Sequence, residues 1–339
     1  MKLLSVAVPC YNSQDYMEKC INSILVGGED VEILIVDDGS TDKTAEIADK
    51  YERDYPEIVR AIHKENGGHG DAVNTGYRNA TGKYFKVCDS DDWFDASAFK
   101  KVLKTLRELE EKNQEIDLLL ANYVYDKVGR KKKKVMKYKG ALPEKKIIGW
   151  NEDDIKFNKF QYVLMHSVIY RTQMLRDCGL KLPKHTFYVD NIYVFQPMVK
   201  VKKLMYLNVD LYHYFIGREG QSVNEQTMIK RIDQQLFINK VLIDFFSKNK
   251  ELPKQKYKFM FQYLDMMMCV SSVMCIISGD KEKLKKKQQL WDYLKIKDID
   301  LYHQLRRTIF GIWMNLPGKV GRFFSKTGYQ VMQKVFGFN

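Results

Sequence analysis

The chain has 339 residues, 45% of them hydrophobic, which is enough to build the core of one large domain or two smaller ones. Its formal net charge is +13, and no run of eighteen or more uncharged apolar residues is present, so we expect no transmembrane helix. An apolar strand pattern begins at Leu3 without a preceding basic segment, so we expect no signal peptide. The six cysteines lack Cys-x-x-Cys spacing, which favours reduced thiols in a cytoplasmic protein.

The charge is distributed unevenly along the chain. Residues 1–100 carry 11 basic and 19 acidic side chains, whereas residues 101–339 carry 45 basic and 24 acidic ones. A basic second part indicates an anionic partner. We do not expect nucleic acid, because no zinc-finger, RRM or helix-turn-helix pattern is present. An anionic membrane surface is the favoured partner.

The first part of the chain alternates strand and helix patterns. Strands are predicted at 3–9, 31–36, 58–63, 83–88 and 116–125, and helices at 14–26, 41–54, 69–80 and 96–113. This alternation predicts an α/β fold, with a doubly wound, mostly parallel sheet flanked by helices. After a further strand at 203–215, helices at 228–248, 254–278 and 281–294 predict a helical C-terminal module.

Polar turns follow three of these strands. They are Pro9-Cys10-Tyr11-Asn12, then Asp37-Asp38-Gly39-Ser40-Thr41-Asp42, then Asp89-Ser90-Asp91-Asp92. Because ligands bind outside the carboxyl ends of parallel strands, we expect a site at this edge of the sheet. Three carboxylates in four residues repel one another unless a cation lies between them, and Mg²⁺ and Mn²⁺ prefer such oxygen ligands. The alternative is a solvated acidic turn in which Asp92 caps the next helix.

These turns resemble the ordered motifs of family 2 inverting glycosyltransferases with the GT-A fold. Three further segments belong to the same resemblance: Asn66-Gly67-Gly68, Asn74-Thr75-Gly76 and Ala80-Thr81-Gly82-Lys83-Tyr84. The resemblance is close over residues 1–95 and looser to about residue 225. It implies metal-dependent transfer, with Mn²⁺ or Mg²⁺, of a sugar from a UDP-sugar to a hydroxyl of a saccharide or lipid-linked acceptor in cell-surface glycan synthesis. Members often have Ala-Arg-Asn where this chain has Ala72-Val73-Asn74. A basic contact to the donor is therefore missing or is supplied by another residue, such as His69.

The resemblance also implies roles for single residues. Asp91 is expected to bind the metal together with Asp89, and Asp190 is expected to be the catalytic base, although Val189 replaces the acid that usually precedes it. The alternative for Asp190 is a cap on a helix that starts at Asn191. The residues expected to bind the nucleotide-sugar are Pro9, Tyr11, Asn12, Asp37, Asp38, Asn66, Gly67, Gly68, Asp89, Ser90, Asp92 and Arg218. Arg218 is otherwise part of a surface hairpin turn. His166 and His185 are assigned no role.

The last part of the chain mixes aromatic, aliphatic and basic residues. Residues 301–339 contain 6 basic side chains and no acidic one, and Pro317-Gly318 divides them into two short amphipathic pieces. This pattern is typical of a helix that lies on anionic lipid. The alternatives are that the apolar stripe packs on the catalytic domain or in a homo-oligomer. We therefore expect a GT-A domain at 1–225, a helical module at 226–300 and a membrane-associating tail at 301–339, on the inner face of the cell membrane.

Two other functions remain open from the sequence. A nucleotidyltransferase shares the α/β layer and the metal, but it usually needs a glycine-rich phosphate loop with a basic residue, which Val8 to Asn12 lacks. A non-catalytic, membrane-associated scaffold would keep the fold without the activity. The retained carboxylates of the three strand ends argue against such a scaffold.

Overall fold

The computed structural model describes residues 2–129, 133–150, 155–158, 161, 163–217 and 224–336. The chain divides into two compact units, Met1–Arg218 and Glu219–Asn339. The sequence had suggested a boundary near residue 225 and a separate tail from residue 301. In the structure, the helices on both sides of residue 301 belong to the same second unit.

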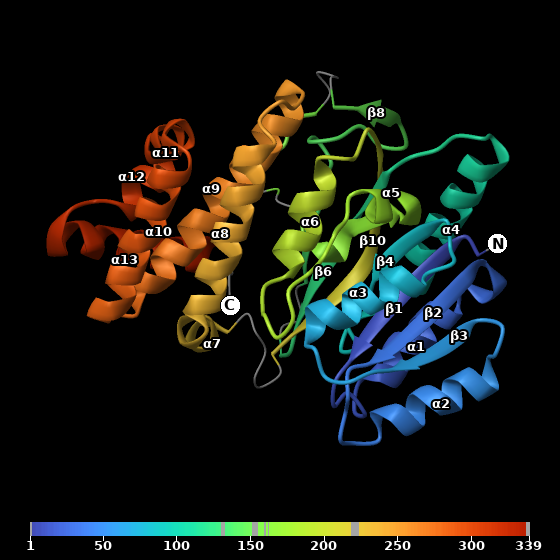
Figure 1. Ribbon diagram of the computed structural model, residues 1–339. Helices are drawn as coiled ribbons and strands as arrows, with labels where there is room; N and C mark the ends of the chain where they lie inside the picture. The colour runs from blue at the N-terminus through green and yellow to red at the C-terminus, as the bar shows by residue number, and fades with distance from the viewer. Residues whose placement is uncertain are drawn as a thin grey trace. The chain divides into compact units, whose positions relative to one another are not determined.

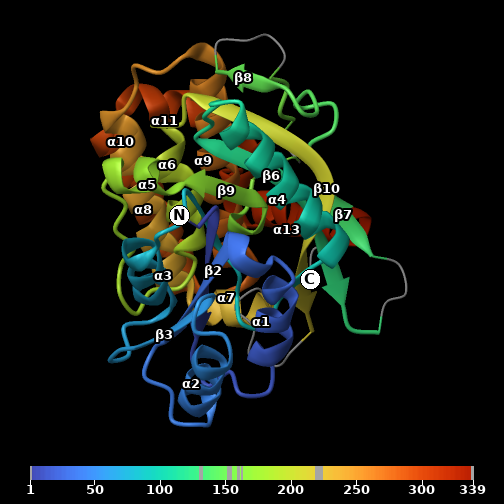
Figure 2. The same ribbon diagram turned by 90° about the vertical axis from the view of Figure 1, so that its right-hand side faces the viewer.

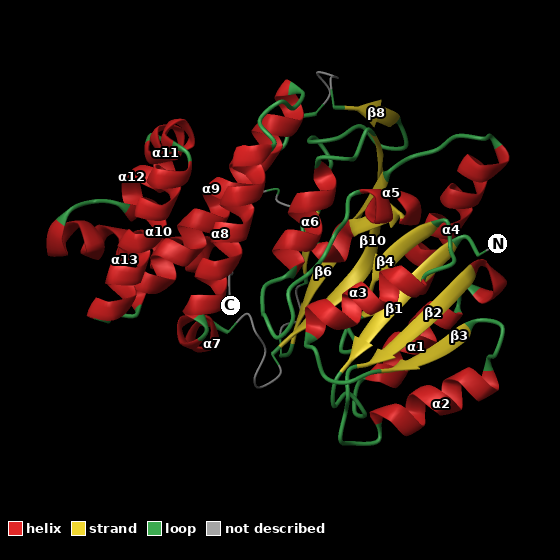
Figure 3. Ribbon diagram, in the orientation of Figure 1, coloured by secondary structure: helices red, strands yellow, loops and turns green. Residues whose placement is uncertain are grey.

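The first unit is built on one mixed sheet, shown in yellow in Figure 3. Its core is a parallel layer in the order β3-β2-β1-β4, and an antiparallel strand, β9, separates β4 from the parallel pair β6 and β10. The main strands are β1 (Leu4–Cys10), β2 (Val31–Asp37), β3 (Val59–His63), β4 (Tyr84–Val87), β6 (Leu118–Lys127), β9 (Val168–Arg171) and β10 (Lys203–Ile216). The predicted doubly wound, mostly parallel sheet is confirmed.

Three short strands extend this sheet. They are β5 (Trp93–Phe94) and β8 (Ile147–Gly149), which pair antiparallel with β10, and β7 (Lys134–Met136), which forms a hairpin with β6. Figure 2 shows β10 as a long, curved strand beside β6. The register between the two strands shifts between Leu207 and Asp210, so the strand bends at this point. Its distal half thereby reaches the turn that follows β4.

Helices cover both faces of the sheet (Figure 3). They are α1 (Met17–Leu25), α2 (Thr44–Asp54), α3 (His69–Asn79), α4 (Ala96–Glu111), α5 (Thr172–Asp177) and α6 (Asp190–Met198). Successive residues of a strand point to opposite faces, and β1 shows this directly. Val6 and Val8 belong to the apolar cluster that includes residues of α1 and α4, whereas Ala7 faces Gly76 of α3. A strand buried on both faces needs such a continuous apolar run.

The helix α4 has its own N-cap. The Asp95 carboxylate accepts a hydrogen bond from the backbone N–H of Ala98 at 2.8 Å. Asp92 therefore does not cap this helix, and the alternative that explained Asp92 in this way is wrong. Its carboxylate is instead 1% exposed and bonded to β10, as described below.

The second unit consists of helices in its described residues (Figure 1). They are α7 (Glu225–Lys230), α8 (Ile232–Lys248), α9 (Lys254–Ile277), α10 (Lys281–Lys297), α11 (Ile299–Arg306), α12 (Ile309–Met314) and α13 (Gly318–Phe336). Helices α8, α10, α12 and α13 pack against α9. By length and composition α9 is apolar enough to cross a membrane, but 67% of its most apolar window is buried within the protein. We interpret α9 as the central helix of this unit.

Candidate functional site

Three strand ends meet at the carboxyl edge of the parallel layer. Asn12, after β1, accepts a hydrogen bond from the backbone N–H of Thr41 at 2.9 Å, and its own N–H donates to the Ser40 hydroxyl at 3.0 Å. The hydroxyls of Ser13 and Ser90 are 2.8 Å apart and join the turns after β1 and β4. Asn12 has a φ of 48°, a left-handed conformation that asparagine tolerates better than most residues. The structure therefore brings together the three turns that the sequence placed at one edge.

Asp38 holds the glycine-rich loop. The residue is 2% exposed, and its carboxylate accepts hydrogen bonds from the backbone N–H of Gly67 at 2.9 Å and of Gly68 at 2.7 Å. The Lys64 ammonium donates to the same carboxylate at 2.6 Å. The Asn66 side chain donates to the Asp38 carbonyl at 2.8 Å. Asp38 thus fixes the loop backbone, and a nucleotide that binds this carboxylate has to compete with these donors.

Asp37 is engaged in a similar way. Its carboxylate accepts a hydrogen bond from the backbone N–H of Ser40 at 3.0 Å and lies 3.0 Å from Nδ1 of His63. The hydrogen bond to Asp37 raises the pKa of His63 above its usual value. The predicted contacts of Asp37 and Asp38 with the nucleotide remain predictions.

The glycine-rich loop and the start of α3 also contact the segment that leads to Asp190. The backbone N–H of His185 donates to the Gly67 carbonyl at 2.7 Å, and a Cβ atom at Gly70 would lie 2.8 Å from the Pro183 carbonyl oxygen. On α3, the Asn74 side chain exchanges two hydrogen bonds with the backbone of Leu182, at 2.8 and 3.0 Å. The close approach of these backbones requires glycine at position 70. A Cβ atom at Gly70 would also lie 3.3 Å from a methyl group of Val189, so the start of α6, where Asp190 lies, is next to the start of α3.

His69 lies between two groups of carboxylates. Its Nε2 atom is 2.8 Å from Oδ1 of Asp89. Burial lowers the pKa of His69, but the charges of Asp89, Asp190 and Asp91 raise it by more, so the net pKa is above the usual value. Burial raises the pKa of Asp190 to about 6, although the nearby His69 acts in the opposite direction. The charges of Asp89 and of the predicted base Asp190 therefore act on the same imidazole.

Asp190 is the first residue of α6, and its side chain caps no helix. The Asn191 side-chain amide lies 3.3 Å from its Oδ1 atom. Tyr188, two residues earlier, has a φ of 65°, and such left-handed non-glycine residues are concentrated near functional sites. The capping alternative for Asp190 is therefore not what the structure shows, and the carboxyl group remains a candidate base.

Asp92 anchors the turn to β10. Its Oδ2 atom accepts a hydrogen bond from the Tyr212 hydroxyl at 2.6 Å, and its Oδ1 atom accepts one from the backbone N–H of Phe215 at 2.8 Å. The Tyr212 hydroxyl also accepts a hydrogen bond from the backbone N–H of Asp89 at 3.1 Å. Burial, and then the charges of Asp91 and Asp89, raise the pKa of Asp92 well above its usual value. Asp92 thus fixes the turn after β4 to strand β10.

His166 belongs to this site, although the sequence gave it no role. Its ring stacks on that of Tyr212 with centroids 4.7 Å apart, and burial lowers its pKa to about 4, so the imidazole is neutral at pH 7. The Nδ1 atom is buried without a hydrogen-bond partner. Lys86, fully buried in β4, donates from Nζ to the His166 carbonyl at 2.7 Å. A lone histidine in an irregular segment carries no sequence signal for this position.

One set of metal-ligating atoms comes together among the described residues. Asp89, Asp92 and His166 each offer one ligand atom, and these atoms lie within 4.8 Å of one another. Asp89 is shared with the predicted metal pair, whereas Asp91, the other predicted ligand, is not part of this set. Carboxylates suit Mg²⁺ and Mn²⁺, whereas imidazole suits zinc, copper, iron and nickel, so this donor set by itself does not select one metal.

The remaining predicted residues differ in their position. Pro9 is buried within β1, Tyr11 is 54% exposed beyond its end, and Ser90 lies in the turn after β4. Arg218 lies outside the residues that the structure describes, as does the segment that follows it to residue 223.

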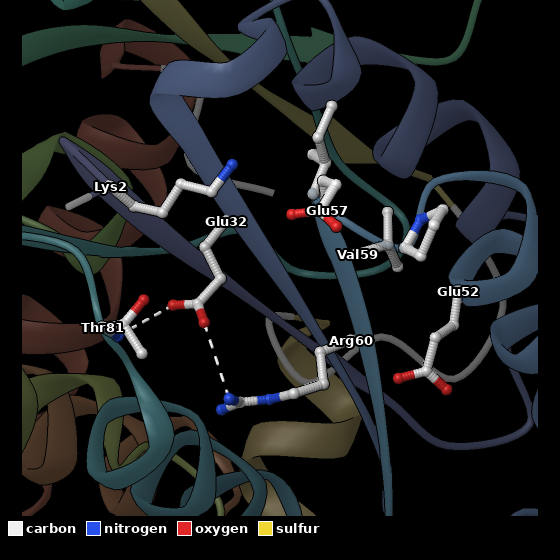
Figure 4. A pocket seen from close by; sticks show the side chains of 9 residues that line it. Lys2, Glu32, Glu52, Glu57, Val59, Arg60 and Thr81 are labelled. Atoms are coloured by element: carbon white, nitrogen blue, oxygen red, sulfur yellow. Dashed lines mark hydrogen bonds and ion pairs between the residues drawn. The ribbon is translucent and has the colours of Figure 1, made fainter.

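A shallow pocket of about 230 Å³ lies at the opposite, amino edge of the sheet (Figure 4). The polar group at its centre, Glu32, is bonded within the protein. The Glu32 carboxylate accepts hydrogen bonds from the Ser5 hydroxyl at 2.6 Å and the Thr81 backbone N–H at 2.8 Å, and it lies 3.7 Å from Arg60. We therefore interpret this pocket as structural.

Comparisons with known proteins agree with these observations. Residues 5–177 match the family model described as Glycosyl transferase family 2. The uncharacterized glycosyltransferase EpsJ of Bacillus subtilis is 40% identical over 113 residues, which cover 33% of this chain and 31% of EpsJ. The poly(ribitol-phosphate) beta-N-acetylglucosaminyltransferase TarS of Staphylococcus aureus is 26% identical over 228 residues, which cover 66% of this chain and 37% of TarS. The chain thus spans about a third of the length of these two relatives.

Solved structures show the same fold. TarS residues 1–349 in complex with UDP-GlcNAc align with a TM-score of 0.53 and 21% identity over 90% of each chain. The mannosyltransferase PcManGT from Pyrobaculum calidifontis, in complex with GDP-Man and Mn²⁺, aligns with a TM-score of 0.51 and 11% identity over 99% of this chain and 88% of that one. At such identities the likeness establishes the fold alone, which is the GT-A fold.

Proposed function

The chain belongs to glycosyl transferase family 2, and from this premise we propose that it transfers a sugar, with inversion, from a UDP-sugar to a hydroxyl of a saccharide or lipid-linked acceptor. The observation that carries the proposal is the contact of His69 with Asp89 at the carboxyl edge of the sheet, with the charge of Asp190 acting on the same imidazole. A carboxylate motif for the donor and a separate carboxyl group for the acceptor are the two parts that inverting transfer needs. Cell-surface glycan synthesis is the proposed process, because the relative TarS is named as a glycosyltransferase that acts on poly(ribitol-phosphate).

The donor is proposed to bind at the carboxyl edge of β1, β2 and β4. The backbone N–H groups at the start of α3 favour an anionic group such as a diphosphate, whereas those of Gly67 and Gly68 donate to Asp38. The relative TarS has been solved in complex with UDP-GlcNAc, which supports a uridine nucleotide here. Arg218 is proposed to add positive charge at the leaving group.

Asp89 and Asp91 are proposed to hold a divalent cation, and the position of His166 adds an imidazole to the available donors. The buried, unpartnered Nδ1 atom of His166 is an observation that fits a bound ion. When bound, Mn²⁺ or Mg²⁺ supplies positive charge that stabilises the diphosphate leaving group. The relative PcManGT has been solved with Mn²⁺, which supports this choice.

Asp190 is proposed to act as the base. Its ionised carboxylate accepts the proton of the acceptor hydroxyl while that oxygen attacks the anomeric carbon and the bond to the diphosphate breaks. Attack from the face opposite the leaving group inverts the anomeric configuration. A pKa near 6 suits this role, because a base is most effective when its pKa is close to the working pH.

The protein is also proposed to work at the inner face of the cell membrane, where a lipid-linked acceptor would be presented. The basic residues of 301–339 support association with an anionic lipid surface.

The experiment also distinguishes the two alternative functions that the sequence left open. A nucleotidyltransferase would bind a nucleoside triphosphate in preference to a UDP-sugar, and a scaffold would bind neither.

The test is a thermal-shift panel of nucleotide-sugars and nucleoside triphosphates with the full chain, in Mn²⁺, in Mg²⁺ and in EDTA. We expect metal-dependent stabilisation by one UDP-sugar in the native chain, lost in Asp91→Ala while the unliganded melting temperature is retained. Stabilisation by triphosphates alone would favour the nucleotidyltransferase. No response to any nucleotide would favour the scaffold.

A further inference from the structure

Helix α13 presents its apolar stripe to solvent. Val320, Phe323, Phe324 and Val331 are 70%, 65%, 54% and 53% exposed, and their spacing places them on one face of the helix. A helix in a globular protein ordinarily turns such a stripe towards the core. In α13 the apolar stripe points away from the core instead, so its exposure requires an explanation.

Small residues on the buried face of α13 fix this orientation, in which the apolar stripe points to solvent. Gly321 and Ser325 of α13 are buried, and the Ser325 hydroxyl donates to the Trp313 carbonyl of α12 at 2.6 Å. A Cβ atom at Gly321 would lie 2.6 Å from Leu316, and one at Gly328 would lie 2.6 Å from the Trp313 ring. The inner face therefore has no room even for a methyl group. Rotating α13 to bury its phenylalanines would place large rings in this contact, which excludes that alternative packing.

Helix α12 shows the same exposure. Ile309, Ile312 and Trp313 are 63%, 50% and 43% exposed, whereas Met314 is 7% exposed. Tryptophan is typical of surfaces that meet both water and an apolar phase, because its ring is apolar and its N–H is polar. We call the seven exposed residues of the two helices the outer stripe: Ile309, Ile312, Trp313, Val320, Phe323, Phe324 and Val331. α12 and α13 are neighbours within the second unit (Figure 1).

Basic side chains flank the outer stripe. Lys319 and Lys326 are exposed and lie seven residues apart, so they project from one flank of α13, on the side away from the buried glycine and serine. Residues 301–339 contain no acidic side chain. A partner for this surface needs an apolar centre and negative charge at its margin.

A second copy of the chain does not meet this requirement. In a two-fold symmetric contact the same surface pairs with itself, so the basic flanks of two copies would meet with no acidic residue from 301–339 to balance them. A leaflet with anionic headgroups supplies both features, since acyl chains accept the apolar stripe and phosphates accept the lysines.

We propose that the outer stripe is the face that docks on an anionic lipid surface, with α13 lying parallel to it. This inference rests on the proposed membrane association and specifies the residues that carry it. Phe323 and Phe324 insert, and Lys319 and Lys326 contact the headgroup phosphates. The small inner face of α13 keeps these side chains outward in the absence of lipid.

The experiment is flotation of the full chain with phosphatidylcholine vesicles, with and without phosphatidylglycerol, at low and high salt. We expect the native chain to float only with the anionic vesicles and to be released by salt. The variant F323S/F324S is expected to lose at least tenfold in vesicle affinity. K319E/K326E is expected to lose the preference for phosphatidylglycerol. The matched control is Ile296→Ser in α10, since Ile296 is 86% exposed and lies outside the outer stripe.

The outcomes separate the proposals. If the native chain and F323S/F324S float equally, membrane association stands but the outer stripe is not its docking face. If the native chain does not float, both claims fall, while sugar transfer is tested independently by the nucleotide panel. Light scattering without vesicles tests whether the outer stripe is instead an interface between copies of the chain. A native oligomer that becomes monomeric in F323S/F324S would make the stripe a protein interface and overturn the proposal. Circular dichroism and thermal unfolding verify that each variant is folded.

Discussion

The Nε2 atom of His69 lies 2.8 Å from Oδ1 of Asp89, at the start of α3. This contact joins the glycine-rich loop to the acidic turn after β4. The charge of Asp190 also acts on the same imidazole. One residue therefore links the proposed metal motif to the proposed base.

Replacing His69 should weaken donor binding. His69→Ala removes a charge-assisted hydrogen bond of Asp89, a class of interaction worth about 1.5–3 kcal/mol, so we expect UDP-sugar affinity to fall about tenfold or more. His69→Gln retains a hydrogen-bond donor and should lose less. Isothermal titration with metal present measures both. Equal affinities in all three proteins would show that the contact does not organise the donor site.

Enlarging Gly70 should displace the base. The added methyl of Gly70→Ala would lie 2.8 Å from the Pro183 carbonyl, so the segment that leads to Asp190 has to move. We expect turnover to fall about tenfold or more, with a smaller loss of UDP affinity. Arg78→Ala, an exposed position on the same helix, is the control and should keep its turnover. Unchanged turnover in Gly70→Ala would mean that this contact does not position the base.

Asp38→Asn should destabilise the first unit. Asparagine has one acceptor oxygen, and its amide would face the N–H of Gly67 or Gly68, which leaves a buried donor unpaired. The cost is roughly 2–3 kcal/mol in the free energy of unfolding. Urea denaturation measures it, with the exposed Asp54→Asn in α2 as the control. A midpoint equal to that of the native chain would show that the carboxylate is not needed to hold the loop.

The reaction rate should depend on pH through Asp190. Burial raises its pKa to about 6, and the base acts only when ionised, so the active form is present above pH 6 and is lost as the pH falls through that value. We expect kcat/KM for hydrolysis or transfer to fall about tenfold per pH unit below this point. A profile that stays flat to pH 4 would exclude a base with this pKa.

The positions of the strand ends were predictable from local patterns. Continuous apolar runs at β1 and β2 indicated buried parallel strands, and the acidic turns after them had to share an edge. The four-residue strand β9 was missed, because an antiparallel strand of this length has too little periodicity to be recognised. Its insertion between β4 and β6 also places His166, in the preceding segment, against Tyr212.

Other features depend on contacts between residues distant in sequence. The sequence placed Asp38 at the nucleotide, but it gave no indication that Gly67 and Gly68 would donate to this carboxylate. For α13, the sequence indicated an amphipathic helix but not which face would be buried. Gly321 and Ser325 decide that, because only small residues fit against α12 and the residues that follow it.

The most direct test of the central claim separates the chemistry from the binding. Asp190→Asn removes the base but keeps a side chain of the same size, and it should fold at least as stably at pH 7, since burial disfavours the ionised carboxylate there. UDP release from the UDP-sugar identified by the binding panel is measured for both proteins with metal present. We predict a loss of at least a hundredfold in turnover, with UDP affinity within about threefold of the native value. Near-native turnover in Asp190→Asn would contradict the account, because the transfer would then proceed without its proposed base.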